Sequence, residues 1–277
     1  MTEKADQTMA ARWAKRSKAW AKSAPKGRSQ DDSFNRMIIA ELDIRPGETI
    51  LDIAGGSGNP SVSIADSMEG DGMVLCTDLT PKMLETARGR AENFGLDVMH
   101  FTAADMMALP VPDGMFDCVT CRFGLMYAAV KIAAAREALR TLKPGGRIAY
   151  VMWGPYDENP PFFVPRRTIP SYFHEEEPPP AARHCMGEPG AILAVLDEAG
   201  FVRTEERELR YRNEVPDMDV YIANGLRRSF SDRTEGMDET EFDRLKEAMF
   251  EAWAPYVEDG QLRVPNYVRM GIGWKAQ

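Results

Sequence analysis

The sequence predicts an α/β fold with a mostly parallel sheet, because two patterns alternate along most of its 277 residues. Short apolar runs, which are typical of buried strands, are followed by longer segments with apolar residues at helical spacing. This alternation indicates strand–helix–strand units, whose crossover helices cover a parallel sheet. The first run, Thr49 to Ile53, ends abruptly in glycines, and the next, Met73 to Thr77, ends in Asp78. We expect a ligand at these two strand ends.

Each expected element follows from its local pattern. Helical patterns at 8–24 and 31–42 precede the first strand, which predicts an N-terminal helical cap over residues 1–44. The strands are expected at about 49–53, 73–77, 98–101, 116–121, 146–152, 201–212 and 266–274. The helices after the cap are expected at about 61–68, 81–94, 130–142 and 190–199.

Two segments interrupt this alternation. Residues 154–189 are dense in proline and aromatic residues, too apolar for a disordered linker and too broken for one helix. They predict an ordered lid built from short pieces, which follows a core at 45–153. Residues 190–277 then complete the sheet, with a helical insertion at about 217–256.

The turn after the first strand predicts a small polar ligand close to the backbone. Residues 54–58 read Ala-Gly-Gly-Ser-Gly, and glycines allow close approach while the next helix directs its free N–H groups at the turn. Asp78 lies twenty residues beyond Gly58, the separation at which an acidic side chain accepts both hydroxyls of a ribose. An adenosine-containing cofactor is therefore expected. A dinucleotide would need a third glycine where Ser61 stands, so it is disfavoured.

Four segments occur in the order and spacing of a known family. They are Leu-Asp-Ile-Ala-Gly-Gly-Ser-Gly, Thr-Asp-Leu-Thr-Pro-Lys-Met-Leu, Ala-Ala-Asp-Met-Met-Ala-Leu-Pro-Val-Pro-Asp-Gly-Met-Phe-Asp and Leu-Lys-Pro-Gly-Gly-Arg. Over residues 45–153 the chain resembles a class I S-adenosylmethionine-dependent methyltransferase and is most similar to the small-molecule branch of ubiquinone and menaquinone biosynthesis. The resemblance implies a Rossmann-like seven-stranded sheet with an antiparallel last strand. It also implies S-adenosyl-L-methionine as cofactor and S-adenosyl-L-homocysteine as product.

The resemblance further implies which residues hold the cofactor. The glycine turn would lie under the methionine and ribose, Asp52 near the methionine amino group, and Asp105 at the adenine amino group. Arg122, which ends the fourth strand, would offer its backbone carbonyl to the ammonium group. The full expected set is Asp52, Ala54, Gly56, Gly58, Asp78, Leu79, Ala104, Asp105, Met106 and Arg122.

The side chains expected around the methyl acceptor are apolar and aromatic, which favours a hydrophobic small molecule. They are Met126, Tyr127, Trp153, Phe162, Phe163, Tyr172 and Phe173. The alternative is that these side chains form the core of the lid itself. An oxygen or activated carbon nucleophile would need a base, and His184 in the lid is the candidate catalytic residue, unless it is simply a solvated histidine.

The charge composition of the chain limits the classes of partner that we expect it to bind. A net charge of −9 argues against a nucleic-acid surface, which needs a basic face. The exception is the basic arm at residues 1–28, which contains Trp13 and Trp20. This arm is either a solvated helix face, or a segment that closes over the cofactor or attracts an anionic substrate.

Targeting and metal signals are lacking in the sequence. No apolar run approaches 18 residues and no secretory signal stands at the start, so we expect no membrane span and a cytoplasmic protein. Cys118 and Cys121 form a C-x-x-C pair inside a predicted strand, which favours buried thiols over a metal site. The expected partners are a hydrophobic acceptor and, as an open alternative, a second copy of the chain.

The leading functional hypothesis is transfer of a methyl group to O, C, N or S of a hydrophobic or aromatic small molecule. One alternative is a nucleotide-dependent oxidoreductase. Another is a cofactor-binding protein of the same fold that uses the sulfonium for non-methylating chemistry, because one fold hosts many functions.

Overall fold

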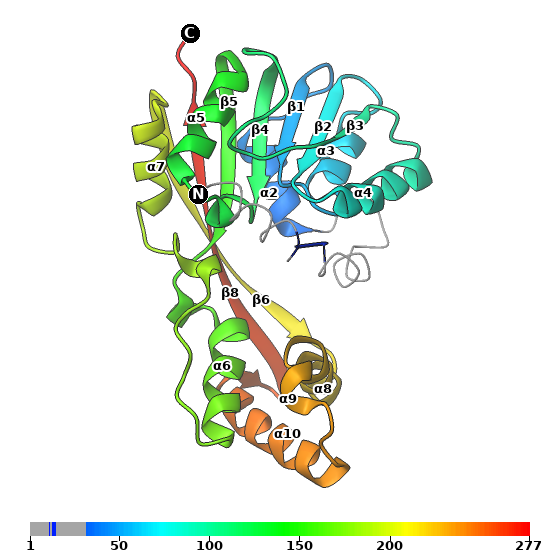
Figure 1. Ribbon diagram of the computed structural model, residues 1–277, viewed down its shortest axis with the longest axis vertical. Coiled ribbons are helices and arrows are strands. Elements are labelled where there is room, and N and C mark those ends of the chain that lie inside the picture. The colour runs from blue at the N-terminus through cyan, green and yellow to red at the C-terminus, as the bar shows by residue number, and fades with distance from the viewer. Residues whose placement is uncertain (1–10, 12, 15–31) are drawn as a thin grey trace. The chain divides into compact units, whose positions relative to one another are not determined.

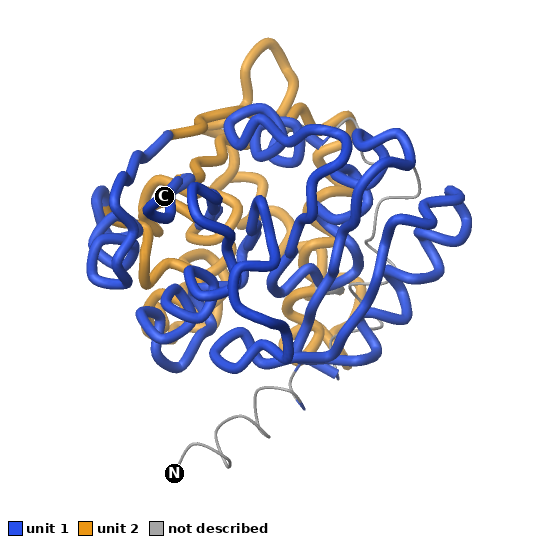
Figure 2. The backbone as a smooth tube through the Cα atoms, turned by 90° about the horizontal axis from the view of Figure 1, so that it is seen from above, with its two compact units in different colours: residues 1–152, 189–207, 270–277 blue, residues 153–188, 208–269 orange. Residues whose placement is uncertain are grey.

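The computed structural model describes residues 11, 13, 14 and 32–277, and the chain divides into two compact units. Unit 1 comprises residues 1–152, 189–207 and 270–277, and unit 2 comprises residues 153–188 and 208–269 (Figure 2). The helix predicted at 8–24, most of the basic arm and most of the expected cap lie outside the described residues.

The sheet has the strand order β3-β2-β1-β4-β5-β8-β6, and the short β7 pairs with β8. The strands are β1 Thr49–Ile53, β2 Met73–Asp78, β3 Met99–Ala103, β4 Phe116–Arg122, β5 Leu142–Trp153, β6 Arg203–Val215, β7 Val257–Glu258 and β8 Gln261–Trp274. The pairs among β1 to β5 are parallel, whereas β7 and β8 are antiparallel. The predicted α/β class with a mostly parallel sheet is confirmed, and β7 is a strand that the sequence patterns did not indicate.

The chain's last strand passes the start of β5 in the opposite direction. The N–H of Gly145 donates to the carbonyl of Ala276 over 3.0 Å, and the N–H of Lys275 donates to the carbonyl of Gly146 over 2.8 Å. Because one partner number rises as the other falls, this register is antiparallel. The antiparallel end of the sheet therefore agrees with the expectation from the resemblance.

Strand β1 lies at the centre of the parallel part and is covered on both faces. Ile50, Leu51 and Ile53 are each at most 2% exposed, which explains why this strand reads as a continuous apolar run. Asp52 stands in the same strand, opposite Cys76 of β2 and Thr120 of β4. A carboxylate is thereby enclosed within the sheet.

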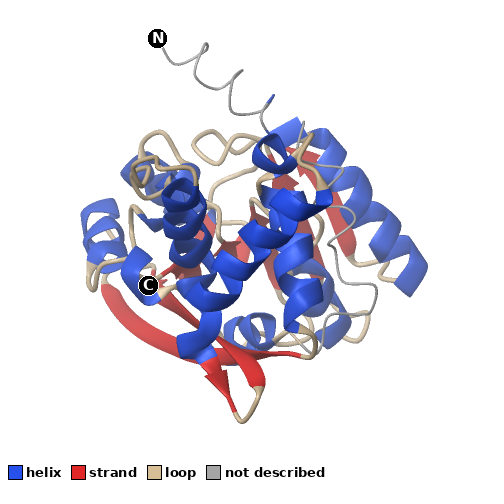
Figure 3. Cartoon of the chain, turned by 90° about the horizontal axis from the view of Figure 1, so that it is seen from below, coloured by secondary structure: helices blue, strands red, loops and turns tan. Residues whose placement is uncertain are grey.

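The helices of unit 1 lie along these strands (Figures 1 and 3). They are α2 Ser33–Glu41, α3 Ser61–Ser67, α4 Pro81–Phe94, α5 Lys131–Thr141 and α7 Ala191–Ala199, with a 3₁₀ turn η1 at Leu125–Tyr127. Helices α3 and α4 pack on β2, and α5 packs against α7. The bounds of α4 equal the predicted range, because Pro81 begins the helix and Gly95, with a φ of +66°, ends it in the left-handed conformation.

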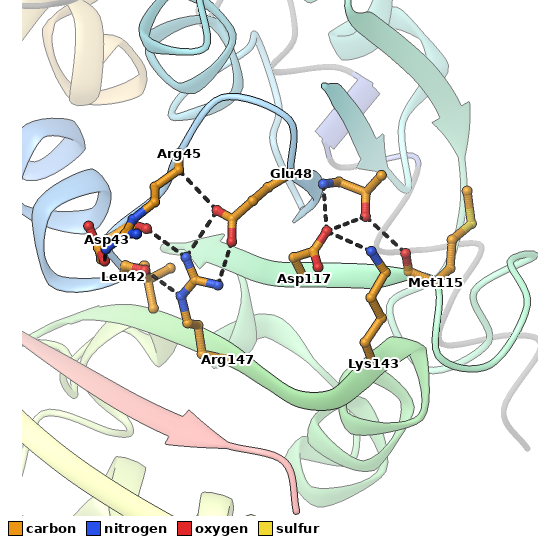
Figure 4. A network of polar contacts seen from close by, with 9 residues as sticks. Leu42, Asp43, Arg45, Glu48, Met115, Asp117, Lys143 and Arg147 are labelled. Atoms are coloured by element: carbon orange, nitrogen blue, oxygen red, sulfur yellow. Dashed lines mark hydrogen bonds and ion pairs between the residues drawn. The ribbon is translucent and has the colours of Figure 1, made fainter. Parts of the chain in front are cut away.

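Ion pairs and hydrogen bonds join the amino ends of the strands (Figure 4). Arg147 of β5 pairs with Glu48, which precedes β1, over 2.9 Å. Asp117 of β4 accepts hydrogen bonds of 2.8 Å from the backbone N–H of Thr49 and from the Lys143 ammonium group. These contacts join β1, β4 and β5 at the edge opposite their carboxyl ends, so the loops at the carboxyl edge do not have to hold the strands together.

Unit 2 has a helical core of its own. Its helices are α6 Pro160–Tyr172, α8 Met218–Ser229, α9 Ser231–Thr234 and α10 Glu239–Trp253, with 3₁₀ turns η2 Tyr156–Glu158, η3 Ala182–His184 and η4 Ala254–Tyr256. Helix α10 packs against α6 and α8, and Leu245 and Trp253 are at most 1% exposed between them. Among the described residues, no helix combines the length and the apolar character needed to cross a bilayer.

Residues 154–189 consist of several pieces rather than one helix, as expected, but one piece, α6, is a helix of 13 residues that the sequence patterns did not indicate. Pro165 and Pro170 lie inside the helix, and each removes one backbone N–H. Val164 and Ile169, the residues just before them, are at most 4% exposed within the core of unit 2. Burial of this apolar face offsets the lost hydrogen bonds, which local propensity alone does not reveal.

Candidate active site

Four strand ends meet at the carboxyl edge of unit 1. The strand order reverses between β1 and β4, and ligands of open α/β sheets bind at such a switch point. Ala54 follows β1 directly, Asp78 ends β2, Ala104 follows β3 and Arg122 ends β4. The structure therefore brings the residues predicted to hold the cofactor to one edge, although their individual roles stay predictions.

Three of the five residues at positions 54–58, in the loop after β1, have left-handed backbone. Gly56 and Gly58 have φ values of +56° and +94°. A Cβ at Gly58 would lie 3.0 Å from the side chain of Val62 and 3.3 Å from that of Ala87, so this position has no room for a side chain. Ala54 adopts a φ of +56° without being a glycine, which costs of the order of 1 kcal/mol or more and is typical of functional sites.

The loop after β4 carries the same feature. Phe123 has a φ of +58°, and the next residue, Gly124, would place a Cβ 2.6 Å from the Cβ of Ala54. The two strained positions thus follow the two strands on either side of the switch point. Their loops pack on each other with no space between them.

Asp78 is hydrogen-bonded to the glycine loop. Its carboxylate accepts from the N–H of Gly56 over 3.1 Å and from the N–H of Thr80 over 2.8 Å. Its backbone carbonyl accepts from the N–H of Ala104 over 3.0 Å, which joins the ends of β2 and β3. Burial raises the pKa of Asp78, and the two N–H donors oppose this rise. Each carboxylate oxygen keeps a further lone pair, so the group can still accept hydroxyls.

Asp52 lies in β1, before the loop, and its side chain reaches the loop at Gly55. Its side chain is fully buried and accepts hydrogen bonds from the hydroxyl of Thr120, over 2.8 Å, and from that of Ser61. A Cβ on Gly55 would lie 2.6 Å from the Asp52 carboxylate, so the loop rests on this group. Burial raises the pKa of Asp52 to about 6. Asp52 therefore ties β1 to β4 and to the first residue of α3.

Arg90 is a residue of the site that sequence reasoning missed. It projects from α4, is 8% exposed, and donates to the carbonyl of Ser57 over 2.8 Å. The same guanidinium lies 3.4 Å from the carbonyl of Gly58 and 3.3 Å from the side-chain oxygen of Asn59. The available signal was a basic residue on the buried face of α4, three residues after Ala87.

Helix α2 is attached to the end of β4 through Arg122. The Arg122 guanidinium pairs with Asp32 over 2.9 Å and donates to Asn35 over 2.7 Å. It also lies over the rings of Phe34 and Phe123, 5.1 and 5.4 Å from their centroids. The side chain of Arg122 therefore holds α2, while the predicted role of Arg122 concerned only its backbone carbonyl.

Two of the predicted acceptor residues lie in unit 1. Met126 is buried and Tyr127 half-buried in the turn η1, which follows β4. The ring of Trp13 packs edge-on against Tyr127 with centroids 5.1 Å apart. A described part of the basic arm thus contacts a residue at the carboxyl edge of the sheet.

The remaining acceptor residues lie in unit 2, in two places. The rings of Trp153 and Phe162 are 4.8 Å apart, and those of Phe162 and His184 are 4.9 Å apart, so these three residues form one cluster. Phe163 packs at its margin, against Tyr156. Phe163 also packs against the helical core of unit 2, as do Tyr172 and Phe173, which contact each other.

His184 has the hydrogen bonding that a base requires. Its Nδ1 lies 3.1 Å from the carbonyl of Gly154, and because a carbonyl only accepts, Nδ1 carries the proton. The lone pair of the neutral ring is then on Nε2, which is buried and has no hydrogen-bond partner among the described residues. Burial lowers the pKa of His184, which keeps the ring neutral at physiological pH.

The two cysteines of the C-x-x-C pair are buried in β4. Burial raises the pKa of both, that of Cys121 to about 12, so neither is a thiolate at neutral pH. Within the part of the chain that the structure describes, no group of three or more His, Cys, Asp or Glu side chains could hold a metal ion.

Solved structures define the class of fold. The protein YcgJ from Bacillus subtilis aligns with a TM-score of 0.57 at 19% identity, over 88% of this chain and 98% of that chain. A phosphoethanolamine N-methyltransferase from Haemonchus contortus, solved with S-adenosyl-L-methionine, aligns with a TM-score of 0.55 at 18% identity, over 89% of this chain and 53% of that one. The chain therefore has the Rossmann-like fold found in methyltransferases.

Sequence comparison finds similarity to one family of methyltransferases over part of the chain. Residues 29–156 match the model of the ubiE/COQ5 methyltransferase family, so the resemblance inferred from the four motifs is confirmed over this segment. A ubiquinone/menaquinone biosynthesis C-methyltransferase UbiE from Marinomonas is 37% identical over 116 residues, and one from Salmonella arizonae is 38% identical over the same length. Each match covers 42% of this chain and 46% of the relative, so the chain matches about half the length of these relatives.

Substitution of Gly124 by alanine should destabilise unit 1 by about 1–3 kcal/mol, because its new Cβ would lie 2.6 Å from Ala54 and 2.7 Å from the Cys121 sulfur. Gly89→Ala is the matched control, since Gly89 lies within α4 and a Cβ added there would meet nothing within 4 Å. That substitution should be neutral or stabilise by up to about 1 kcal/mol. Urea unfolding measures both, and equal effects of the two substitutions would contradict the packing described.

Asp52→Asn should remove a pH dependence of stability. The folded pKa of about 6 lies above the usual value of an aspartate, so the native state binds the proton more tightly than the unfolded chain. Wild-type stability relative to Asp52→Asn should therefore fall by about 2–3 kcal/mol as pH rises from 4 to 7. Urea unfolding of both proteins across this range provides the measurement. A stability difference that does not change with pH would disprove the assignment.

Proposed function

We propose that the chain is an S-adenosylmethionine-dependent methyltransferase that acts on a hydrophobic or aromatic small molecule. The observation that carries this proposal is the strained glycine loop at the switch point, with the Asp78 carboxylate hydrogen-bonded to it. The match of residues 29–156 to a methyltransferase family supports the same activity.

The residues at this edge fit the proposed cofactor. Gly56 is half-buried and donates its N–H to Asp78, and the Asp78 carboxylate keeps lone pairs for two ribose hydroxyls. Asp105 would accept from the adenine amino group, with Leu79 and Met106 against the ring. When bound, the cofactor supplies an electrophilic methyl group on a positively charged sulfur. The chain's task is then to align the acceptor with that methyl group and to exclude water.

The dinucleotide alternative is further disfavoured by the role of Ser61. Its hydroxyl donates to the buried Asp52 carboxylate at the first residue of α3. A glycine there, as a dinucleotide fingerprint requires, would leave that carboxylate with one hydroxyl partner fewer. The side chain at this position thus supports the loop through the Asp52 carboxylate.

We assign the acceptor side to apolar and aromatic residues, which suit a phenol or quinol. The names of the matched relatives, C-methyltransferases of ubiquinone and menaquinone biosynthesis, favour an acceptor of this class. Within unit 2, Trp153 and Phe162 would contact the ring, beside His184. Tyr172 and Phe173 pack into the helical core, which weakens their candidacy.

His184 is the proposed base. Its Nε2 would accept the hydroxyl proton of the acceptor, while Nδ1 stays bonded to the carbonyl of Gly154. The cofactor, held by the residues at the strand ends of unit 1, would offer its methyl group to that oxygen or to a ring carbon activated by it, and a methylated ring carbon would also have to lose its own proton. Hydrogen bonding through Nδ1 fixes the ring in the tautomer that this proton transfer requires.

The activity is tested with methyl-labelled S-adenosyl-L-methionine and a panel of phenols, quinols, amines and thiols. The wild-type chain should transfer label to a phenol or quinol. Asp78→Asn should raise the KM for the cofactor at least tenfold, because an amide accepts fewer hydroxyl hydrogen bonds than a carboxylate. Asp97→Asn, at an exposed aspartate before β3, is the control and should behave as wild type. Labelled product with none of the acceptors would refute the proposal.

His184→Asn should lower kcat by about 10²–10⁴-fold, the usual contribution of a general base. In the wild type, kcat should rise with pH through an apparent pKa below 6.5 and then level off, because the neutral ring is the active form and burial lowers its pKa. His174→Asn is the control, since His174 is exposed and its φ of +57° suits asparagine. An unchanged pH profile in His184→Asn would remove His184 from the mechanism.

A further inference from the structure

Two neighbouring arginines of α6 differ in how their charges are compensated. Arg167 pairs with Asp157 over 2.5 Å and with Glu177 over 3.3 Å. Within the part of the chain that the structure describes, Arg166 donates to the backbone carbonyls of Pro178 and Pro179 alone, over 3.4 and 2.5 Å. No carboxylate of the described residues lies within ion-pair distance of Arg166, although its side chain is half-buried.

Arg166 also has an unsatisfied donor. Its Nε is buried and has no hydrogen-bond partner among the described residues. An unpaired buried donor on a charged group is costly, and a ligand or an ordered water is one explanation for such a group. Arg166 is therefore poorly explained as a purely structural residue, in contrast to Arg167.

The position of Arg166 relates it to the aromatic cluster. It stands four residues after Phe162 on α6, so the two side chains lie on the same face of the helix. Phe162 packs on His184, and the guanidinium of Arg183 lies over the Phe162 ring at 4.8 Å. The pKa of His184 is lowered mainly by burial, and the charges of Arg183 and Arg166 lower it further.

The cluster therefore combines three chemical features. Arg166 offers an unused N–H donor and a positive charge, and His184 offers an unused acceptor at Nε2. Trp153 and Phe162 supply an aromatic wall beside them. A ligand that complements all three has an anionic oxygen, a hydroxyl and a planar apolar body.

We propose that unit 2 binds the acceptor by an anionic group, a carboxylate or a phosphate, at Arg166, with the acceptor's hydroxyl at Nε2 of His184. The acceptor class is then an aromatic hydroxy acid or its phosphate counterpart rather than a neutral phenol. Arg183, stacked on Phe162, adds positive charge to the same place. This inference rests on the proposed methyltransferase function and specifies its substrate.

The test compares ligands that share one ring. The protein, saturated with S-adenosyl-L-homocysteine, is titrated calorimetrically with 4-hydroxybenzoate, 4-hydroxyphenyl phosphate and phenol. At least one of the two anions should bind tenfold or more tightly than phenol, and the order of the anions tells a carboxylate site from a phosphate site. Equal binding of all three, or no binding of either anion, overturns the inference.

Variants of the two arginines provide the matched comparison. Arg166→Gln should reduce the affinity for the preferred anion to that for phenol, and Arg166→Lys should retain part of the preference because the charge remains. Arg167→Gln, the control beside it, should change neither affinity more than twofold. Equal losses in Arg166→Gln and Arg167→Gln would contradict the site. Circular dichroism and binding of S-adenosyl-L-homocysteine by each variant report folding and the proposed function separately from acceptor binding.

Discussion

The structure of unit 1 depends on the contacts that hold the turn after β1 in place. The chain leaves β1 through a loop in which Ala54, Gly56 and Gly58 have left-handed backbone. The buried carboxylate of Asp52 holds the hydroxyls of Ser61 and Thr120, and so links the strand before the turn to the helix after it and to the neighbouring strand. Arg90 binds the loop carbonyls from α4. Because the contacts of Asp52 and Arg90 hold the loop on one side, the backbone on its other side can face a ligand.

This support has an energetic consequence. Burial of a carboxylate disfavours its ionisation, and Asp52, which forms no ion pair with any described residue, accordingly has a raised pKa. Strain at Ala54 and Phe123 adds to that cost. Such costs persist where the surrounding structure over-determines the geometry, and here the ion pairs of Arg147 and Asp117 secure the same strands at their other ends. Contacts at the amino edge of the sheet thus stabilise the fold, whereas the strained backbone and the buried carboxylate toward the carboxyl edge destabilise it.

The sequence predicted the parts of the fold that depend on local signals. Both ends of α4 were predicted to the residue, because a proline and a glycine mark them. The strand β1 was equally clear, as an apolar run followed by glycines. Helix α6 was missed since two internal prolines oppose helix formation locally, and only its packing in the core of unit 2 stabilises it.

The site was predictable to the extent that its motifs are contiguous. The residues at the strand ends follow from four short segments, whereas Arg90 and the Arg122–Asp32 pair depend on contacts across the fold that no local pattern encodes. The sequence could not fully distinguish acceptor residues from core residues. Tyr172 and Phe162 occur in the same aromatic-rich segment, but Tyr172 packs against the helical core of unit 2 and Phe162 packs on His184. The charge of Arg166 was the overlooked signal, since among the described residues it has no carboxylate partner, whereas Arg167 has two.

The central claim is that the loop after β1, with Asp78, holds an adenosine-containing sulfonium cofactor. Isothermal titration of the wild-type chain with S-adenosyl-L-homocysteine tests it most directly, with NAD titrated in parallel. The account predicts binding of one S-adenosyl-L-homocysteine per chain and no heat with NAD. Saturable binding of NAD, or the absence of any binding of S-adenosyl-L-homocysteine, would contradict it.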